Sequence, residues 1–128
     1  MAKASTTRDT PLTAADKARI AGQCEAFIAY VLVPRFLPEI RPTRFNYPIA
    51  YYGRWRGHRY SFLKRYRSGD PETLGIEFEL PFARLDHIGG ERFDVLWPRH
   101  TGRWYPLYPR LTLRDAMRAI LADELLWP

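Results

Sequence analysis

The sequence predicts a single α+β domain, in which an antiparallel sheet of about five strands is accompanied by an N-terminal and a C-terminal helix. Three observations predict this fold. Apolar residues recur at helical spacing near both ends of the chain, they alternate with polar residues through much of the middle, and turn residues separate the alternating segments. Consecutive strands joined by short turns pair antiparallel. Because an antiparallel sheet commonly buries one face under helices, we expect both helices to cover one face of the sheet.

The first helix is expected to begin after Thr13. The Thr13 side chain can cap the first turn while Asp16, three residues later, reaches back to it, as in a capping box. Apolar residues then follow at helical spacing, at positions Ile20, Cys24, Phe27, Ile28, Val31 and Leu32. We expect the helix to end near Val33, because Pro34 disfavours helical geometry in the residue before it.

The next segment carries two strand signals. Residues 45–51 alternate, and Pro48 within them predicts an edge or bulged strand, because proline cannot donate to a ladder. We expect a turn over residues 53–57. Residues 60–66 then place three aromatic side chains on one strand face, at Tyr60, Phe62 and Tyr66.

The clearest alternation in the chain extends over residues 74–88, with a break at Pro81. Its apolar positions begin with Leu74, Ile76, Phe78, Leu80 and Phe82. The pair Gly89-Gly90 predicts a tight hairpin. Residues 93–97 form the return strand, and after a further turn residues 103–108 form a last short strand.

The final helix is expected to begin after Thr112, with Asp115 as the partner in a second capping box. Its apolar stripe consists of Leu113, Met117, Ile120, Leu121 and Leu125. The arginines and acids between these positions would face water. The order of elements is therefore helix, about five strands, helix.

Residues 15–127 resemble the domain-of-unknown-function family 3024, which consists of small bacterial proteins without an established activity. The resemblance rests on strands near Tyr51 and Tyr60 and on four segments, Leu37-Pro38-Glu39-Ile40-Arg41, Phe93-Asp94-Val95-Leu96-Trp97, Gly102–Pro109 and Asp123–Trp127. Phe93 stands where the family pattern has tryptophan, and the chain ends without a terminal glycine. The resemblance implies the α+β fold class and a bacterial origin, and it implies no catalytic or binding residue.

Composition restricts the cellular compartment in which we expect the protein. The single cysteine, Cys24, excludes an intrachain disulfide and fits a reducing compartment. The polar residues 1–12 contain no apolar leader segment, and we expect them to form a flexible tail before the single domain, residues 13–128. The longest apolar run, residues 26–34, is too short to cross a bilayer. We therefore expect a cytoplasmic protein without a membrane association.

The net charge of +6 is carried by 17 arginines and only 3 lysines, and the charge is uneven along the chain. Residues 35–67 contain nine basic residues and one acid, whereas residues 68–98 contain seven acids and two arginines. One interpretation is that neighbouring hairpins neutralise each other. The other is a bipolar surface with a basic face that binds a ligand.

Arginine and tryptophan cluster at two turns, which are the candidate partner-binding sites. The first cluster consists of Arg54, Trp55, Arg56 and Arg59, and the second of Arg99, Arg103 and Trp104. An exposed tryptophan beside arginines suits base stacking with phosphate contact, and it equally suits an anchor for a protein partner. Alternatively, Trp55 folds back over the sheet, and Trp97 and Trp104 pair as structural filling.

These patterns favour a non-catalytic binding module whose partner is a protein or a nucleic acid. One alternative is a small enzyme acting on a phosphate-bearing substrate, with acid and base groups among Glu77, Glu79, Asp86 and His87. Another is a phage-associated or defence-associated inhibitor or antitoxin. We expect no cofactor and no metal, because the histidines lie on different elements and paired cysteines are absent.

Overall fold

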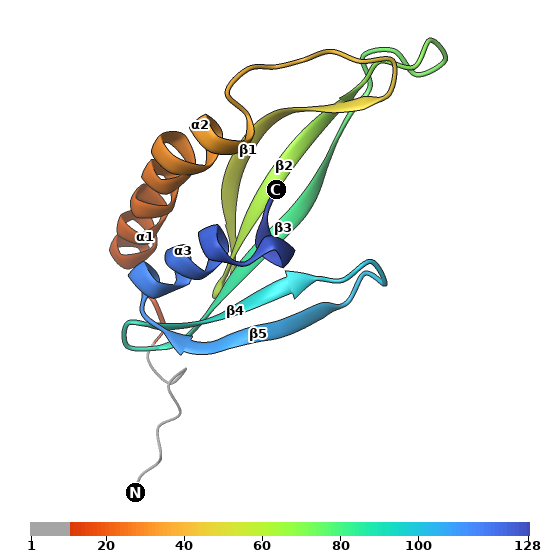
Figure 1. The fold of residues 1–128 in the computed structure, drawn as a ribbon. Helices are drawn as coiled ribbons and strands as arrows, with labels where there is room; N and C mark the ends of the chain where they lie inside the picture. Colours follow the sequence, from red (N-terminus) through yellow and green to blue (C-terminus); the bar gives the residue numbers. More distant parts are fainter. Residues whose placement is uncertain (1–10) are drawn as a thin grey trace, which may run out of the picture.

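The computed structural model describes residues 11–128, and it shows two layers (Figure 1). One layer is a five-stranded antiparallel sheet in which each strand pairs with its neighbour in sequence, in the order β1-β2-β3-β4-β5. The other layer holds the helices, all on one face of the sheet. The expected α+β fold is therefore confirmed, while residues 1–10 of the expected tail lie outside the described residues.

The elements follow the expected order. The strands are β1 (Asn46–Arg56), β2 (Arg59–Ser68), β3 (Glu77–Gly89), β4 (Arg92–Pro98) and β5 (Trp104–Leu111). The helical segments are α1 (Ala14–Phe27), a π-helical turn (Ile28–Leu32), α2 (Val33–Phe36), α3 (Leu113–Ala122) and a 3-10 turn (Glu124–Leu126). No helix in the described part of the chain is long and apolar enough to cross a membrane.

The first helical segment begins as expected and ends later than expected. The capping box between Thr13 and Asp16 is present. The prediction that Pro34 ends the helix near Val33 is wrong, because a π-helical turn precedes the proline. In this turn the Val33 amide donates to the Ile28 carbonyl, five residues back. The wider turn lets Pro34 enter the first turn of α2 without the clash that a regular α-helix would produce.

The core lies between the helices and one face of the sheet. Strand β2 contributes the buried Tyr60 and Phe62, as expected from their shared face. Helix α1 contributes Ile20 and Cys24, and α3 contributes Ile120. At the C-terminus the buried residue is Leu126, while Leu125 is exposed. The expected stripe is wrong at that position, because α3 ends at Ala122 and the following 3-10 turn changes which residue faces the core.

The first hairpin corrects two expectations. The predicted turn over residues 53–57 is wrong, since β1 continues to Arg56 and the chain turns at Gly57 and His58. Gly53 lies inside β1 opposite Phe62 in the register, and a Cβ on it would meet the Tyr60 side chain. Gly53 therefore leaves space for the Tyr60 ring and does not form a turn. Strand β1 is an edge strand with an irregularity beside Pro48, as predicted.

The sheet leaves one face without helices. Alternation along β2 points Ser61, Leu63 and Arg65 away from the helices, and the register places Arg84, Pro81 and Glu79 of β3 opposite these residues. We call this side the helix-free face. It carries the charged network described below.

Candidate functional site

A shallow hollow of about 420 Å³ lies on the helix-free face. The residues that line it come from β1, β2 and β3 and from the start of β5, and they are Arg54, Arg56, Arg59, Ser61, Leu63, Glu79, Pro81, Arg84 and Trp104. Four of these side chains are arginines and one is a carboxylate. The hollow is therefore cationic, with an apolar part formed by leucine, proline and the indole ring.

Glu79 is the centre of a hydrogen-bonded network at one side of the hollow. Arg54 binds its carboxylate in bidentate fashion, with N–O distances of 2.6 and 3.1 Å, and Arg65 Nη2 lies 3.3 Å from the same group. The Tyr52 hydroxyl also donates to it. Hydrogen bonds from Arg54 and Tyr52 lower the pKa of Glu79 to about 2, so the carboxylate is ionised at neutral pH.

Glu77 pairs with arginines in the same way. Arg67 approaches it at 2.9 Å and Arg65 at 3.8 Å. These pairs join the basic hairpin to the acidic one across β2 and β3. The interpretation that the two hairpins neutralise each other is confirmed for these residues.

Arg84 and Asp86 form a buried pair at the other side of the hollow. The guanidinium donates from Nε at 2.7 Å and from Nη2 at 3.0 Å to the two carboxylate oxygens. Its Cζ atom lies 4.5 Å from the centroid of the Trp104 ring. Arg59 reaches Asp86 only at 3.7 Å. Arg84 of β3, held by Asp86, therefore packs against the Trp104 ring of β5. Arg59 makes only a long contact with the same carboxylate.

The structure brings most of the predicted site residues to this one face. Arg54, Arg56, Arg59 and Trp104 line the same hollow, although they were predicted in two separate clusters. Arg84 was not among the predicted site residues. The signal that would have found it is the alternation of β3, which puts Arg84 on the polar side two residues before Asp86.

Trp55, Arg99 and Arg103 lie elsewhere. Of the two positions left open for Trp55, the one in which it folds back over the sheet is confirmed, and an exposed indole at the turn is wrong. The half-buried indole packs edge-on against Tyr60 and donates to the Lys17 carbonyl at 3.0 Å, on the helix-covered side. Arg99 and Arg103 are exposed around the turn between β4 and β5, where Arg99 lies over the Tyr105 ring at 5.5 Å.

Trp97 and Trp104 do not pair with each other. The register places Trp97 opposite Tyr105 and Trp104 opposite Pro98. Trp97 packs against the core, whereas Trp104 lines the hollow on the other face. Structural filling by a tryptophan pair is therefore the wrong description of this turn.

The acid and base candidates of the alternative enzyme hypothesis do not share a site. Glu77, Glu79 and Asp86 are engaged by arginines on the helix-free face. His87 is buried on the other side, where Nε2 lies 2.8 Å from the Gly90 carbonyl oxygen and the ring packs edge-on against Phe93. Within residues 11–128, no group of three or more His, Cys, Asp or Glu side chains is placed to hold a metal ion.

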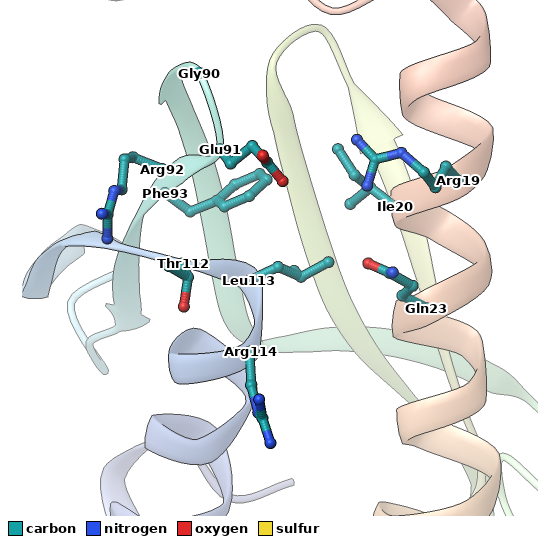
Figure 2. A pocket seen from close by; sticks show the side chains of 10 residues that line it. All are labelled: Arg19, Ile20, Gln23, Gly90, Glu91, Arg92, Phe93, Thr112, Leu113 and Arg114. Atoms are coloured by element: carbon teal, nitrogen blue, oxygen red, sulfur yellow. The ribbon is translucent and has the colours of Figure 1, made fainter.

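A second hollow of about 380 Å³ lies between α1, the start of α3 and the hairpin that joins β3 to β4 (Figure 2). Figure 2 shows that Arg19, Gln23 and Glu91 point into it, whereas Arg92 and Arg114 point away. Its polar lining thus combines one cation, one carboxylate and one amide. It lacks the concentration of positive charge found on the helix-free face.

The fold and the site define a two-layer α+β protein whose helix-free face carries an arginine–carboxylate network. The family model described as domain of unknown function DUF3024 matches residues 12–128, and the chain belongs to this family. The resemblance drawn from the sequence is thereby confirmed. No curated protein and no solved structure matches the chain.

Proposed function

We propose that the protein is a non-catalytic, cytoplasmic binding module that holds single-stranded nucleic acid on its helix-free face. One observation carries the proposal: three arginines of the first hairpin and the ring of Trp104 line the same hollow. Proteins that bind single strands combine a positively charged groove for the backbone with aromatic rings on which bases stack. The hollow places both groups within one site.

The arginines of the site divide into two classes. Arg54 and Arg84 are bound by carboxylates in bidentate geometry, so they shape the site and offer little charge to a ligand. Arg56 is exposed and forms no ion pair or hydrogen bond within residues 11–128, and Arg59 has only its long contact to Asp86. These two side chains are the ones that a phosphate group would engage.

Arg99 and Arg103 are exposed outside the hollow, at the turn between β4 and β5, and they provide two further cations. With Arg56 and Arg59 they give four exposed arginines that no carboxylate binds in bidentate geometry, and we take these four as the phosphate contacts. For single strands, four such contacts correspond to a slope of about −2.8 in log K against log salt, or a loss of about 50-fold in affinity between 50 and 200 mM salt. Trp104 adds about 1–3 kcal/mol for one stacked base, independent of salt.

The test is fluorescence anisotropy with labelled single-stranded RNA and DNA and with duplexes, across that range of salt. Arg56→Gln/Arg59→Gln should weaken binding and reduce the slope by about 1.4. Trp104→Leu should weaken binding without changing the slope. The charge-matched control is Arg114→Gln/Arg118→Gln on α3, which should retain most of the affinity.

Two results would refute the proposal. The first is the absence of binding to every nucleic acid at 50 mM salt. The second is an equal loss of affinity in the α3 control, which would show that only net charge matters. Either result would leave an acidic protein surface as the partner that the hollow fits, and the same variants would then be compared in a pull-down experiment.

A further inference from the structure

The first half of β3 has a free strand edge. Strand β2 pairs with β3 from Glu77 onward, whereas β4 pairs with it only from Arg84 to Gly89. Figure 1 shows β4 and β5 diverging from this half of β3. The outer backbone groups of residues 77–83 therefore have no strand partner within the described chain. Such an edge is a template for another strand.

The same segment exposes a row of apolar side chains. Ile76, Phe78 and Leu80 are 58%, 36% and 46% exposed, and they share one side by alternation. Phe78 stacks on Tyr66 of β2, with ring centroids 5.4 Å apart. This is the side that carries the helices, but the upper ends of β1, β2 and β3 extend past α2 (Figure 1). The free edge thus coincides with an apolar surface that the helices do not cover.

The charged side chains on the helix-free face of this part of β3 determine which added strand would be complementary. Glu77 and Glu79 lie on the edge strand itself, while the arginines that bind them lie further inward, on β2 and β1. The nearest side chains to an added strand would therefore be carboxylates. Like charges opposite each other destabilise a strand pair, and opposite charges stabilise it.

This charge pattern disfavours a second copy of the chain as the occupant. When two β3 edges pair antiparallel about a centre at residues 77–79 and keep their apolar residues on one side, Glu77 or Glu79 of one copy lies opposite a glutamate of the other. A strand that alternates apolar residues with arginine or lysine meets the apolar row on one side and the carboxylates on the other. Pro81 cannot donate a hydrogen bond, so the accepted segment is short.

We propose that residues 76–80 accept a short extended segment of a partner protein by β-strand addition, with apolar and basic residues alternating in that segment. In this mode the backbone hydrogen bonds provide affinity and the alternating side chains provide specificity. The surface differs from the nucleic-acid site because it uses the backbone edge and the apolar side of β3, and it shares only Glu79 with the hollow.

The probe is a labelled peptide of about seven residues that alternates valine and arginine, a length that spans the free edge. Two matched peptides serve as controls, one with glutamate in place of arginine and one with N-methylated backbone amides. We expect the valine–arginine peptide to bind and to slow hydrogen exchange at the outward-facing amides among residues 77–80, since the alternate amides already face β2. Both control peptides should bind at least about fivefold more weakly.

Variants of the protein locate the site. Ile76→Thr/Leu80→Thr should reduce peptide affinity at least about fivefold, because the substitutions remove apolar contact area. Both side chains are exposed, so we expect the fold to tolerate the substitutions. Ile40→Thr, at a residue that is 49% exposed outside this surface, should retain the affinity.

Three outcomes would overturn the proposal. One is unchanged hydrogen exchange at the outward-facing amides among residues 77–80 in the presence of the valine–arginine peptide at millimolar concentration. Another is equal binding by the N-methylated peptide. The third is a dimer in sedimentation whose outward-facing amides among residues 77–80 are already protected, which would assign this edge to a second copy of the chain.

Discussion

Gly53 is the position at which a single methyl group should disturb the fold most. A Cβ built on it would lie 2.0 Å from the Tyr60 hydroxyl oxygen and 2.3 Å from Cζ of the same ring, where ordinary contacts are 3.4–4 Å. Tyr60 is 1% exposed and packs between Trp55 and Phe62, with ring centroids 5.3 and 5.4 Å away. The ring has no space into which it can retreat.

We therefore expect Gly53→Ala to lower the free energy of unfolding by about 3 kcal/mol, at the upper end of the range for over-packing. For a domain of this size the melting temperature should fall by about 10 °C. Urea and thermal unfolding, followed by tryptophan fluorescence and circular dichroism, measure both quantities. The matched control is Gly22→Ala on the exposed side of α1, where a Cβ meets nothing within 4 Å and stability should rise by up to about 1 kcal/mol.

A double variant tests the cause. Tyr60→Leu alone should destabilise the protein because it leaves a cavity, but the added methyl group of Gly53→Ala can occupy part of that space. The double variant should therefore cost at least about 1 kcal/mol less than the sum of the single effects. Strict additivity, or a Gly53→Ala variant as stable as the wild type, would show that Gly53 does not face Tyr60 and that the register of β1 on β2 is wrong.

Three further predictions concern charged and reactive groups. The pKa of Glu79 falls from 4.5 to about 2 on folding, so its ion pairs stabilise the protein fully above about pH 4.5 and are lost as the pH falls toward 2. Glu79→Gln should cost about 1 kcal/mol in urea unfolding at pH 7, after allowance for solvent screening, and much less near pH 2, where the carboxylate is about half protonated; equal differences at both pH values would contradict this. Asp86→Ala should cost about 3 kcal/mol because it leaves Arg84 buried without its carboxylate, and Arg84→Met/Asp86→Leu should cost less in the same unfolding assay; a larger loss in the double variant would argue against the pair. Burial raises the pKa of Cys24 to about 12, so a disulfide reagent at pH 8 should leave the thiol unmodified in the native protein and titrate one thiol per chain in urea; rapid modification of the native protein would show that the thiol is accessible.

The sequence predicted those elements that follow from local rules. Alternation placed Phe78 and Leu80 on one side of β3, and side-chain spacing identified Thr13 as the cap of α1. Both signals depend on residues within a few positions of each other. The uneven charge along the chain also anticipated the pairs that Arg67 and Arg54 form with glutamates.

What the sequence did not predict depends on distant neighbours. The sequence suggests that Gly53 is a turn residue, whereas the structure shows that a Cβ at this position would collide with the Tyr60 ring of β2. The sequence left two positions open for Trp55, and only the hydrogen bond to the Lys17 carbonyl of α1 decides between them. The hollow itself depends on the register of the whole sheet, because Arg84 on β3 lies between the first hairpin and Trp104 of β5.

The order of strands in the sheet has a consequence for how the chain folds. Each strand pairs with its neighbour in sequence, so the hairpins form by closing short loops, which is fast. The helix layer is different, because Trp127 packs against Phe36 with ring centroids 5.1 Å apart, and Arg35 lies 4.9 Å from the indole. That contact joins the end of the chain to its first helical segment and closes a loop of nearly the whole domain. We therefore expect the sheet to form before this contact closes, and Trp127 lies where its fluorescence would follow that step.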